Sequence, residues 1–230
     1  MKVARSYCQL STMSVAPTLG VYKLPTIDNE PMRNYEPNSK DRQELQKAVD
    51  ELLACNPFEI PVIIDGQEFR SGKLAKQVNP GDHAQAVCYY HEADERMVSI
   101  AIEGALKAKK QWMNMPWSER AAISMKAADL IAHKYRYQLL AATMVGQGKN
   151  VWQAEIDAGA EICDFLRFGV KYVDDMYQIQ PPRNSPGGWN RTEYRPLEGF
   201  VLAISPFNFT AIAGNLVMTP AMVGNVVVWK

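Results

Sequence analysis

The sequence has no excess of charge of either sign, with 25 basic and 25 acidic side chains among 230 residues. Because binding to nucleic-acid phosphates depends on clustered positive charge, this balance argues against an electrostatic nucleic-acid-binding protein. Metal-binding patterns are also missing, since the four cysteines form no CxxC pair and the three histidines have no HExxH spacing. We therefore expect free thiols, no disulfide framework and no metal site.

Acidic residues are absent from the start of the chain. No Asp or Glu precedes Asp28, whereas Lys2, Arg5 and Lys23 lie among many serines and threonines. This composition is typical of a mitochondrial transit peptide, although a disordered N-terminus has it too. We assign residues 1–37 to an N-terminal segment and predict a location in the mitochondrial matrix.

Charged residues are also absent from residues 199–229. A membrane span could have this composition, but two prolines and three asparagines interrupt the run, and lipid would leave their polar groups unsatisfied. The run divides instead into a buried strand "GFVLAIS", a helix "TAIAGNLVMTPAMVGN" and a second strand "VVVW". This order predicts a βαβ unit, which belongs to a parallel sheet covered by helices.

The region from residue 38 to residue 198 alternates between helical and β patterns. Ser39 and Asp94 can each cap an amphipathic helix, and Ser118 can cap another. The runs "EIPVII" and "EFR" flank Asp65-Gly66, a strong hairpin signal, and "AQAVCYY" predicts a further strand. A long helix over 149–178 ends at "QPPRNSPGGWNR", and "TEYRPLEGFVLAIS" then has β character. The fold class is therefore α/β, with residues 199–230 beginning a Rossmann-like parallel sheet.

The motif "GQGKN" at residues 146–150 is similar to a phosphate-binding loop but does not match it. Thr143 stands where the first glycine is required, Asn150 replaces the final Ser or Thr, and a helix rather than a strand precedes the motif. Gly146 and Gly148 instead predict the end of a helix.

Glu161 is the first candidate binding residue. At about 100° per residue, Ala154, Ala158, Phe165 and Phe168 form one apolar stripe with Glu161 at its centre, and Asp157 lies at the margin. A carboxylate there needs a partner. Glu161 therefore forms a structural ion pair, lies merely at the edge of the stripe, or faces the cationic group of a ligand.

Asn208 is the second candidate, within "SPFNF" at residues 205–209. It follows the carboxyl end of a predicted parallel strand, where α/β sheets bind their ligands. Asparagine is also a common helix cap, so a purely structural role is the alternative.

Two longer stretches carry a resemblance to a known family. The stretch "EGFVLAISPFNFTAIAGNLVMTPAMVGNVVVWK" resembles the beginning of the NAD-binding domain in the aldehyde dehydrogenase superfamily, with its [PS]-P-[WF]-N-[FY] turn and V-x-K strand end. The stretch "TMVGQGKNVWQAEIDAGAEICDFLRF" is similar to the Δ1-pyrroline-5-carboxylate dehydrogenases of proline catabolism. The resemblance runs from about residue 39 to residue 230.

The resemblance implies roles for individual residues. It implies NAD-dependent oxidation of L-glutamate γ-semialdehyde to L-glutamate, with Asn208 donating its side-chain N–H to the oxyanion of the tetrahedral intermediate. Ser205 and Phe207 would line the cofactor, Lys230 would contact its adenosine ribose, and Glu161 would line the substrate pocket.

The resemblance also implies that the chain lacks part of the active site and that it forms oligomers. The family's catalytic cysteine and glutamate match no residue here, so we expect an N-terminal portion of the enzyme that is inactive alone. A hairpin near residues 192–196 helps to form the family's dimer, which implies a homo-oligomer. The alternative is a non-catalytic subunit that pairs with a full-length dehydrogenase through this region.

Overall fold

The computed structural model describes residues 23–55 and 57–230. The greater part of the predicted transit peptide therefore lies outside the described residues. The helices and strands follow the order α1 Lys40–Ala54, β1 Phe58–Ile60, β2 Val62–Ile64, β3 Gln67–Phe69, β4 Leu74–Asn79, β5 Asp82–His91, α2 Glu95–Asn114, α3 Trp117–Asp129, η1 Leu130–Lys134, α4 Arg136–Gln147, α5 Val151–Ala154, η2 Glu155–Glu161, α6 Ile162–Tyr177, β6 Val201–Ala203, α7 Thr210–Met222 and β7 Val227–Trp229. The two η elements are π-helical turns.

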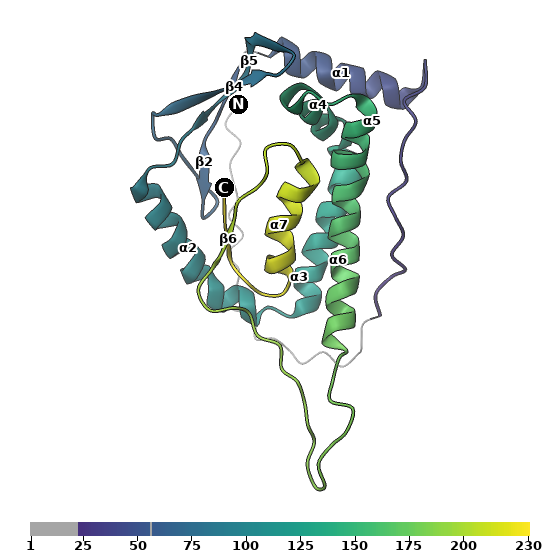
Figure 1. The fold of residues 1–230 in the computed structure, drawn as a ribbon, viewed down its shortest axis with the longest axis vertical. Coiled ribbons are helices and arrows are strands. Elements are labelled where there is room, and N and C mark those ends of the chain that lie inside the picture. The colour runs from purple at the N-terminus through teal and green to yellow at the C-terminus, as the bar shows by residue number, and fades with distance from the viewer. Residues whose placement is uncertain (1–22, 56) are drawn as a thin grey trace, which may run out of the picture.

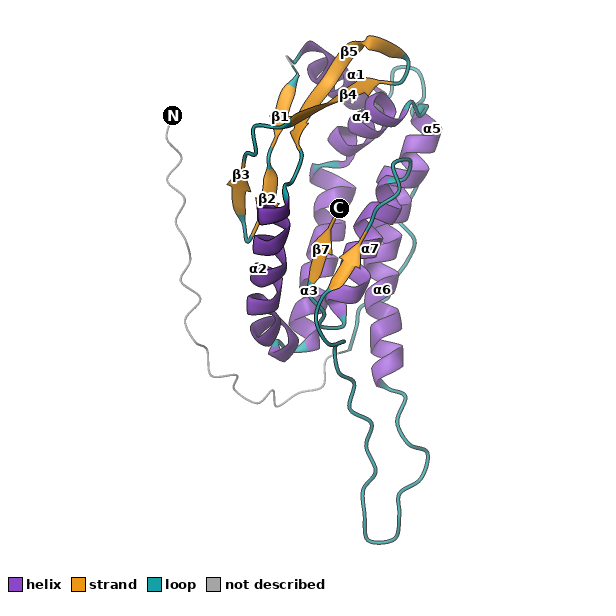
Figure 2. Ribbon diagram, turned by 60° about the vertical axis from the view of Figure 1, so that its left-hand side comes forward, coloured by secondary structure: helices purple, strands orange, loops and turns teal. Residues whose placement is uncertain are grey.

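The predicted βαβ unit is confirmed. Strands β6 and β7 pair in parallel, with Val201 opposite Val227, and α7 connects them. Figure 2 shows these strands beside α7 and separate from the β1–β5–β4 sheet. Helix α7 packs against α6 and α3, where Ala211 joins a buried cluster with Ile162 and Cys163.

One of the polar residues that interrupt the uncharged run, Asn225, is satisfied inside the protein. The Asn225 side chain donates to the Pro220 carbonyl at 3.0 Å and accepts from the Leu197 N–H at 2.8 Å. In the part of the chain that the structure describes, no helix combines the length and the apolar character that crossing a membrane requires.

Local signals place most of the other elements correctly. The Ser39 hydroxyl accepts from the Arg42 N–H at the start of α1, and the Asp94 carboxylate accepts from the Met97 N–H at the start of α2. Asp65 and Gly66 both have positive φ, as the tight turn between β2 and β3 requires.

Three predictions in this region are wrong. The run "EIPVII" is two strands, because Pro61 lacks an N–H and divides β1, which pairs with β5, from β2, which pairs with β3. Ser118 does not cap α3; the helix begins at Trp117, and the Pro116 carbonyl accepts from the Glu119 and Arg120 N–H groups.

The third concerns residues 192–196, which form no strand. Residues 178–200 make an extended excursion beyond the end of α6 (Figure 1). Side chains rather than a strand ladder hold its two arms together, since the Gln180 amide bonds to both backbone groups of Thr192 and the Tyr194 hydroxyl donates to the Ile179 carbonyl. Residues 192–196 therefore have β propensity but pair with no strand within the described residues.

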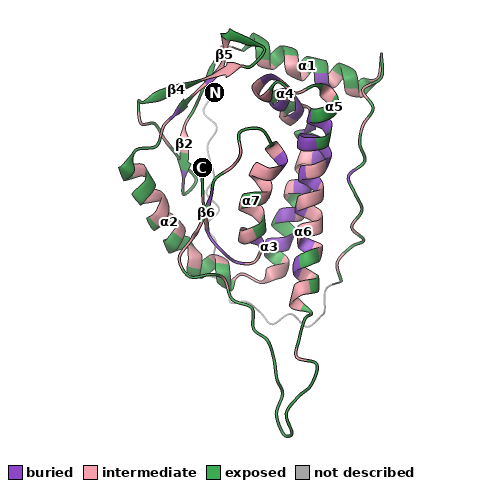
Figure 3. Ribbon diagram, in the orientation of Figure 1, coloured by how far each residue is buried: buried purple, intermediate pink, exposed green. Residues whose placement is uncertain are grey.

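Burial is concentrated where the helices meet. Figure 3 shows the buried residues along α4, η2 and α6, whereas the excursion is exposed. Segment 23–37 passes along the outer side of α6 (Figure 1). The junction of α5 with η2 and the junction of η2 with α6 therefore lie in the buried part of the protein, and the candidate site is built around them.

Candidate functional site

The turn between β6 and α7 brings together the residues that the sequence assigned to the cofactor. The Ser205 N–H donates to the Lys230 carbonyl at 2.9 Å, and the Lys230 N–H donates to the Ala203 carbonyl at 2.8 Å. Ser205 and Lys230 thus lie together at the carboxyl ends of two parallel strands. The Phe207 side chain is 93 % exposed, so it packs on nothing in the described chain.

Asn208 does not cap α7, so the helix-cap alternative is wrong. The N-cap position of α7 is Phe209, with extended backbone and no side-chain cap. Asn208 is exposed. Its backbone carbonyl, in contrast, is held by Lys149 Nζ at 2.6 Å.

A carboxylate from another helix supplies the missing cap. The two Asp157 oxygens accept from the Thr210 N–H at 2.9 Å and the Ala211 N–H at 2.8 Å. Lys149 Nζ donates to Asp157 at 2.7 Å and lies 4.4 Å from the Phe209 ring centroid. The start of α7 and the turn before it are therefore tied to η2 through one ion pair.

The prediction that Glu161 lies at the centre of a buried apolar stripe is wrong, because the helix contains a π-helical turn. Because η2 adds a residue to its turn, the spacing of 100° per residue fails across residues 155–161. Glu155 and Asp157 are buried, at 0 % and 2 % exposure, whereas Glu161 is only half-buried. The most buried carboxylates are thus not the one that the sequence placed at the centre.

Glu161 has no cationic partner among the described residues, so the structural ion pair considered for it is wrong. Burial raises the pKa of its carboxyl, and the nearby Asp157 charge raises it further, although Lys149 opposes this. The carboxylate therefore carries an uncompensated cost in this chain.

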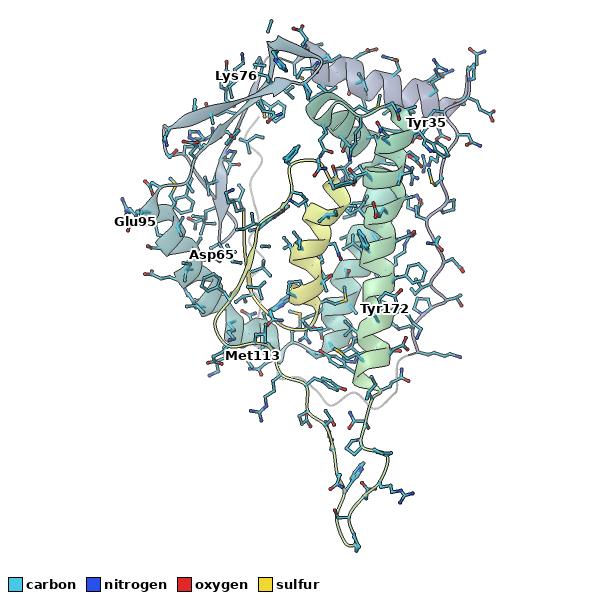
Figure 4. All side chains as sticks on the ribbon, in the orientation of Figure 1. Tyr35, Asp65, Lys76, Glu95, Met113 and Tyr172 are labelled. Atoms are coloured by element: carbon cyan, nitrogen blue, oxygen red, sulfur yellow. The ribbon has the colours of Figure 1, made fainter. Side chains whose placement is uncertain are left out.

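Glu155 belongs to a second network, which holds the N-terminal segment. Arg136 pairs with both Glu155 and Glu30, and Arg167 reaches Glu30 at 2.7 Å. The Tyr35 hydroxyl donates to Glu155 at 2.6 Å where the segment passes α5 (Figure 4). Burial would raise the pKa of Glu30, but hydrogen bonds from Arg167 and Arg136 hold it below its usual value.

Sequence reasoning missed Lys149, Asp157 and Arg136. One signal was present: Glu155 and Asp157 stand in the otherwise small and apolar run "QAEIDAGA", and buried charges of this kind require partners. The helix predicted before the motif "GQGKN" is α4, and Gly148, with φ of 66°, ends it as predicted. Within the described residues, no group of three potential ligands could hold a metal ion.

Comparisons with known proteins show the family to which the chain is related. A model described as the aldehyde dehydrogenase family matches residues 68–230. The Δ1-pyrroline-5-carboxylate dehydrogenase of Agaricus bisporus is 60 % identical over 212 residues, which cover 92 % of this chain and 39 % of that protein. The mitochondrial human enzyme of the same name is 46 % identical over 89 % of this chain and 36 % of its own length.

Solved structures give the same result. The Δ-pyrroline-5-carboxylate dehydrogenase from Mycobacterium tuberculosis bound with NAD has a TM-score of 0.89 and 42 % identity, covering 93 % of this chain and 40 % of that one. The chain spans about two fifths of the length of the relatives that it matches. On the family model and the site geometry together, the chain belongs to the aldehyde dehydrogenase family.

Proposed function

We propose that this chain provides the oxyanion donor and part of the NAD site for the oxidation of L-glutamate γ-semialdehyde, the open form of Δ1-pyrroline-5-carboxylate, to L-glutamate. The observation that carries the proposal is the Asn208 turn, whose backbone carbonyl is bonded while its side chain is exposed at the carboxyl end of β6. The names of the relatives support the substrate, and the NAD-bound relative supports the cofactor.

Each residue has one task in the proposed reaction. The Asn208 side chain donates an N–H to the aldehyde oxygen as that oxygen becomes negative, and a preorganised neutral donor does this well in a dry site. Glu161 accepts from the ammonium group of the substrate, which would offset the cost of its half-buried charge.

The residues around the turn fit a dinucleotide. Ser205 and Lys230 lie together at the carboxyl ends of β6 and β7, where α/β sheets bind such cofactors. NAD, when bound, accepts the hydride that the aldehyde carbon loses as it gains oxygen from water. We propose that Ser205 and Phe207 line this cofactor and that Lys230 contacts its adenosine ribose.

We also propose the mitochondrial matrix as the site of action and a homo-oligomer as the working form. The acid-free start of the chain and relatives named as mitochondrial support the location. Exposed Ile179, Trp189 and Leu197 on the excursion support association with a second dehydrogenase chain. Light scattering on the purified protein checks this, and a monomer would contradict it.

Replacing Asn208 tests the catalytic proposal. In the full-length product of the gene, Asn208→Ala should lower kcat by a factor of about 100 to 1000, as expected for loss of one oxyanion donor. The Kd for NAD should not change, because the amide acts on the substrate oxygen. The assay follows NADH formation with Δ1-pyrroline-5-carboxylate as substrate.

Asn215→Ala, within α7 itself, is the matched control and should keep wild-type turnover. A kcat for Asn208→Ala within a few-fold of wild type would refute the assigned role.

A further inference from the structure

We propose that Lys149 and Asp157 are positioning residues, which hold the Asn208 turn at the geometry that an oxyanion donor requires. This inference rests on the proposed function of Asn208. It also gives a role to the motif "GQGKN", which does not match the pattern of a phosphate loop.

Asp157 holds the residues that follow Asn208. Its two oxygens accept from consecutive N–H groups, Thr210 at 2.9 Å and Ala211 at 2.8 Å, which have no partner within α7. The negative charge also interacts favourably with the positive end of the helix dipole. Because Asp157 is 2 % exposed, water competes little for these contacts.

Lys149 holds Asn208 itself. Its ammonium donates to the Asn208 carbonyl at 2.6 Å and to Asp157 at 2.7 Å, and it lies over the Phe209 ring. Lys149 therefore holds the carbonyl of the peptide that joins Asn208 to Phe209. Asp157, which the same lysine contacts, holds the N–H of Thr210. The Asn208 side chain takes no part in these contacts.

The backbone on both sides of Lys149 is fixed. Gly148 ends α4 in the left-handed conformation, with φ of 66°, and a Cβ added there would lie 3.4 Å from the Cβ of Pro80 in the β4–β5 turn. Asn150 begins α5 with a capping box, in which the backbone and side chain of Asn150 exchange hydrogen bonds with Gln153 at 3.0 Å and 2.9 Å. The lysine therefore starts from a rigid position between two helices.

Helix α4 also contacts the first residue of α7. The Thr210 hydroxyl lies 2.8 Å from the Thr143 hydroxyl and accepts from the Gln147 amide at 3.1 Å. These neutral contacts keep α7 docked without the ion pair. Removing Lys149 should therefore loosen the turn rather than release the helix.

The test compares variants in the full-length product of the gene. Lys149→Met keeps the length of the side chain but removes its donors and charge. We expect kcat to fall by about tenfold to a hundredfold, the usual effect of a misplacement of about 1 Å, while the KM for NAD changes less than about twofold. Lys149→Arg retains the charge and should recover part of the lost turnover.

Lys171→Met is the matched control. It removes a lysine from an exposed ion pair with Asp175 and should leave kcat and the unfolding temperature unchanged. Lys149→Met should unfold within a few degrees of this control, because Asp157 keeps its two backbone N–H donors and Thr143 and Gln147 still hold α7.

The results separate the two proposals. If Asn208→Ala lowers kcat and Lys149→Met does not, the positioning role is overturned and the proposed function stands. If Asn208→Ala leaves kcat unchanged, the proposed function fails and the inference fails with it. A third result would also overturn the positioning role: Lys149→Met lowers both kcat and the unfolding temperature, and Lys149→Arg restores neither. This result would indicate a merely structural residue.

Discussion

Glu155 and Asp157 stand two residues apart in the same π-helical turn, and both are buried, but they face different parts of the molecule. Glu155 contacts Arg136 and segment 23–37, whereas Asp157 contacts Lys149 and the start of α7. One turn of helix therefore ties the N-terminal segment to the core and also orients the candidate catalytic turn. Residues two apart on a helix point in nearly opposite directions, about 200° apart around the axis, so the two carboxylates are buried against different neighbours.

The partners of the two carboxylates differ in kind. Arg136 is fully buried, so its charge depends on Glu155 and Glu30 for compensation. Asp157 mostly serves backbone N–H groups, and its cation Lys149 is nearer the surface. We therefore expect loss of the first carboxylate to affect mainly stability, and loss of the second to affect mainly local geometry.

The largest effect should follow from Glu155→Gln. Removing one partner of a buried ion pair costs about 3 kcal/mol or more of unfolding free energy, because the remaining charge is undercompensated. Urea unfolding measures this. Hydrogen exchange at the Arg33 amide, which donates to Glu155 at 2.8 Å, should become faster.

Glu51→Gln is the control, since Glu51 forms an exposed pair with Lys47 four residues away on α1. Its loss should cost less than about 0.5 kcal/mol. Equal effects of the two variants would remove the distinction between the buried network and the surface.

These networks mark the limit of what the sequence could predict. Ser39, Asp94 and the Asp65-Gly66 turn were recognisable because their signals lie within a few residues of the structure they cause. The βαβ unit was recognisable from its uncharged run. The burial of Glu161 was predicted wrongly because the prediction assumed a regular helix, whereas residues 155–161 form a π-helical turn. The partners of this turn include residues far away in the sequence, such as Arg33, whose N–H donates to Glu155.

A smaller effect on the free energy of unfolding should follow from Asp157→Asn, and hydrogen exchange should change at the start of α7 instead of at Arg33. An amide oxygen can replace only part of the cap, so the unfolding free energy should fall by about 1 to 2 kcal/mol. Hydrogen exchange at the Thr210 and Ala211 amides should become faster, whereas exchange at the Arg33 amide should not change. Faster exchange at all three sites would show that the two networks act as one.

The smallest effect concerns Glu161, the third carboxylate of the turn. Burial holds the pKa of Glu161 above the value of 4.5 for a free side chain. Its protonated form therefore stabilises the fold at acid pH, and this contribution is lost as the pH rises through the folded pKa. At pH 7 the ionised carboxylate lowers the free energy of unfolding, because it forms no salt bridge with a cation within the described residues.

Glu161→Gln should therefore be slightly more stable than wild type at pH 7, by less than about 1 kcal/mol because solvent screens a half-buried charge. The difference should vanish below about pH 4, where the wild-type carboxyl is protonated as well. Urea unfolding at the two pH values measures it, and a less stable variant at pH 7 would mean that the carboxylate has a stabilising partner. A charge that lowers stability in the free protein is one that a cationic ligand group can compensate, so the same variant should raise the KM for the aldehyde substrate as it stabilises the fold.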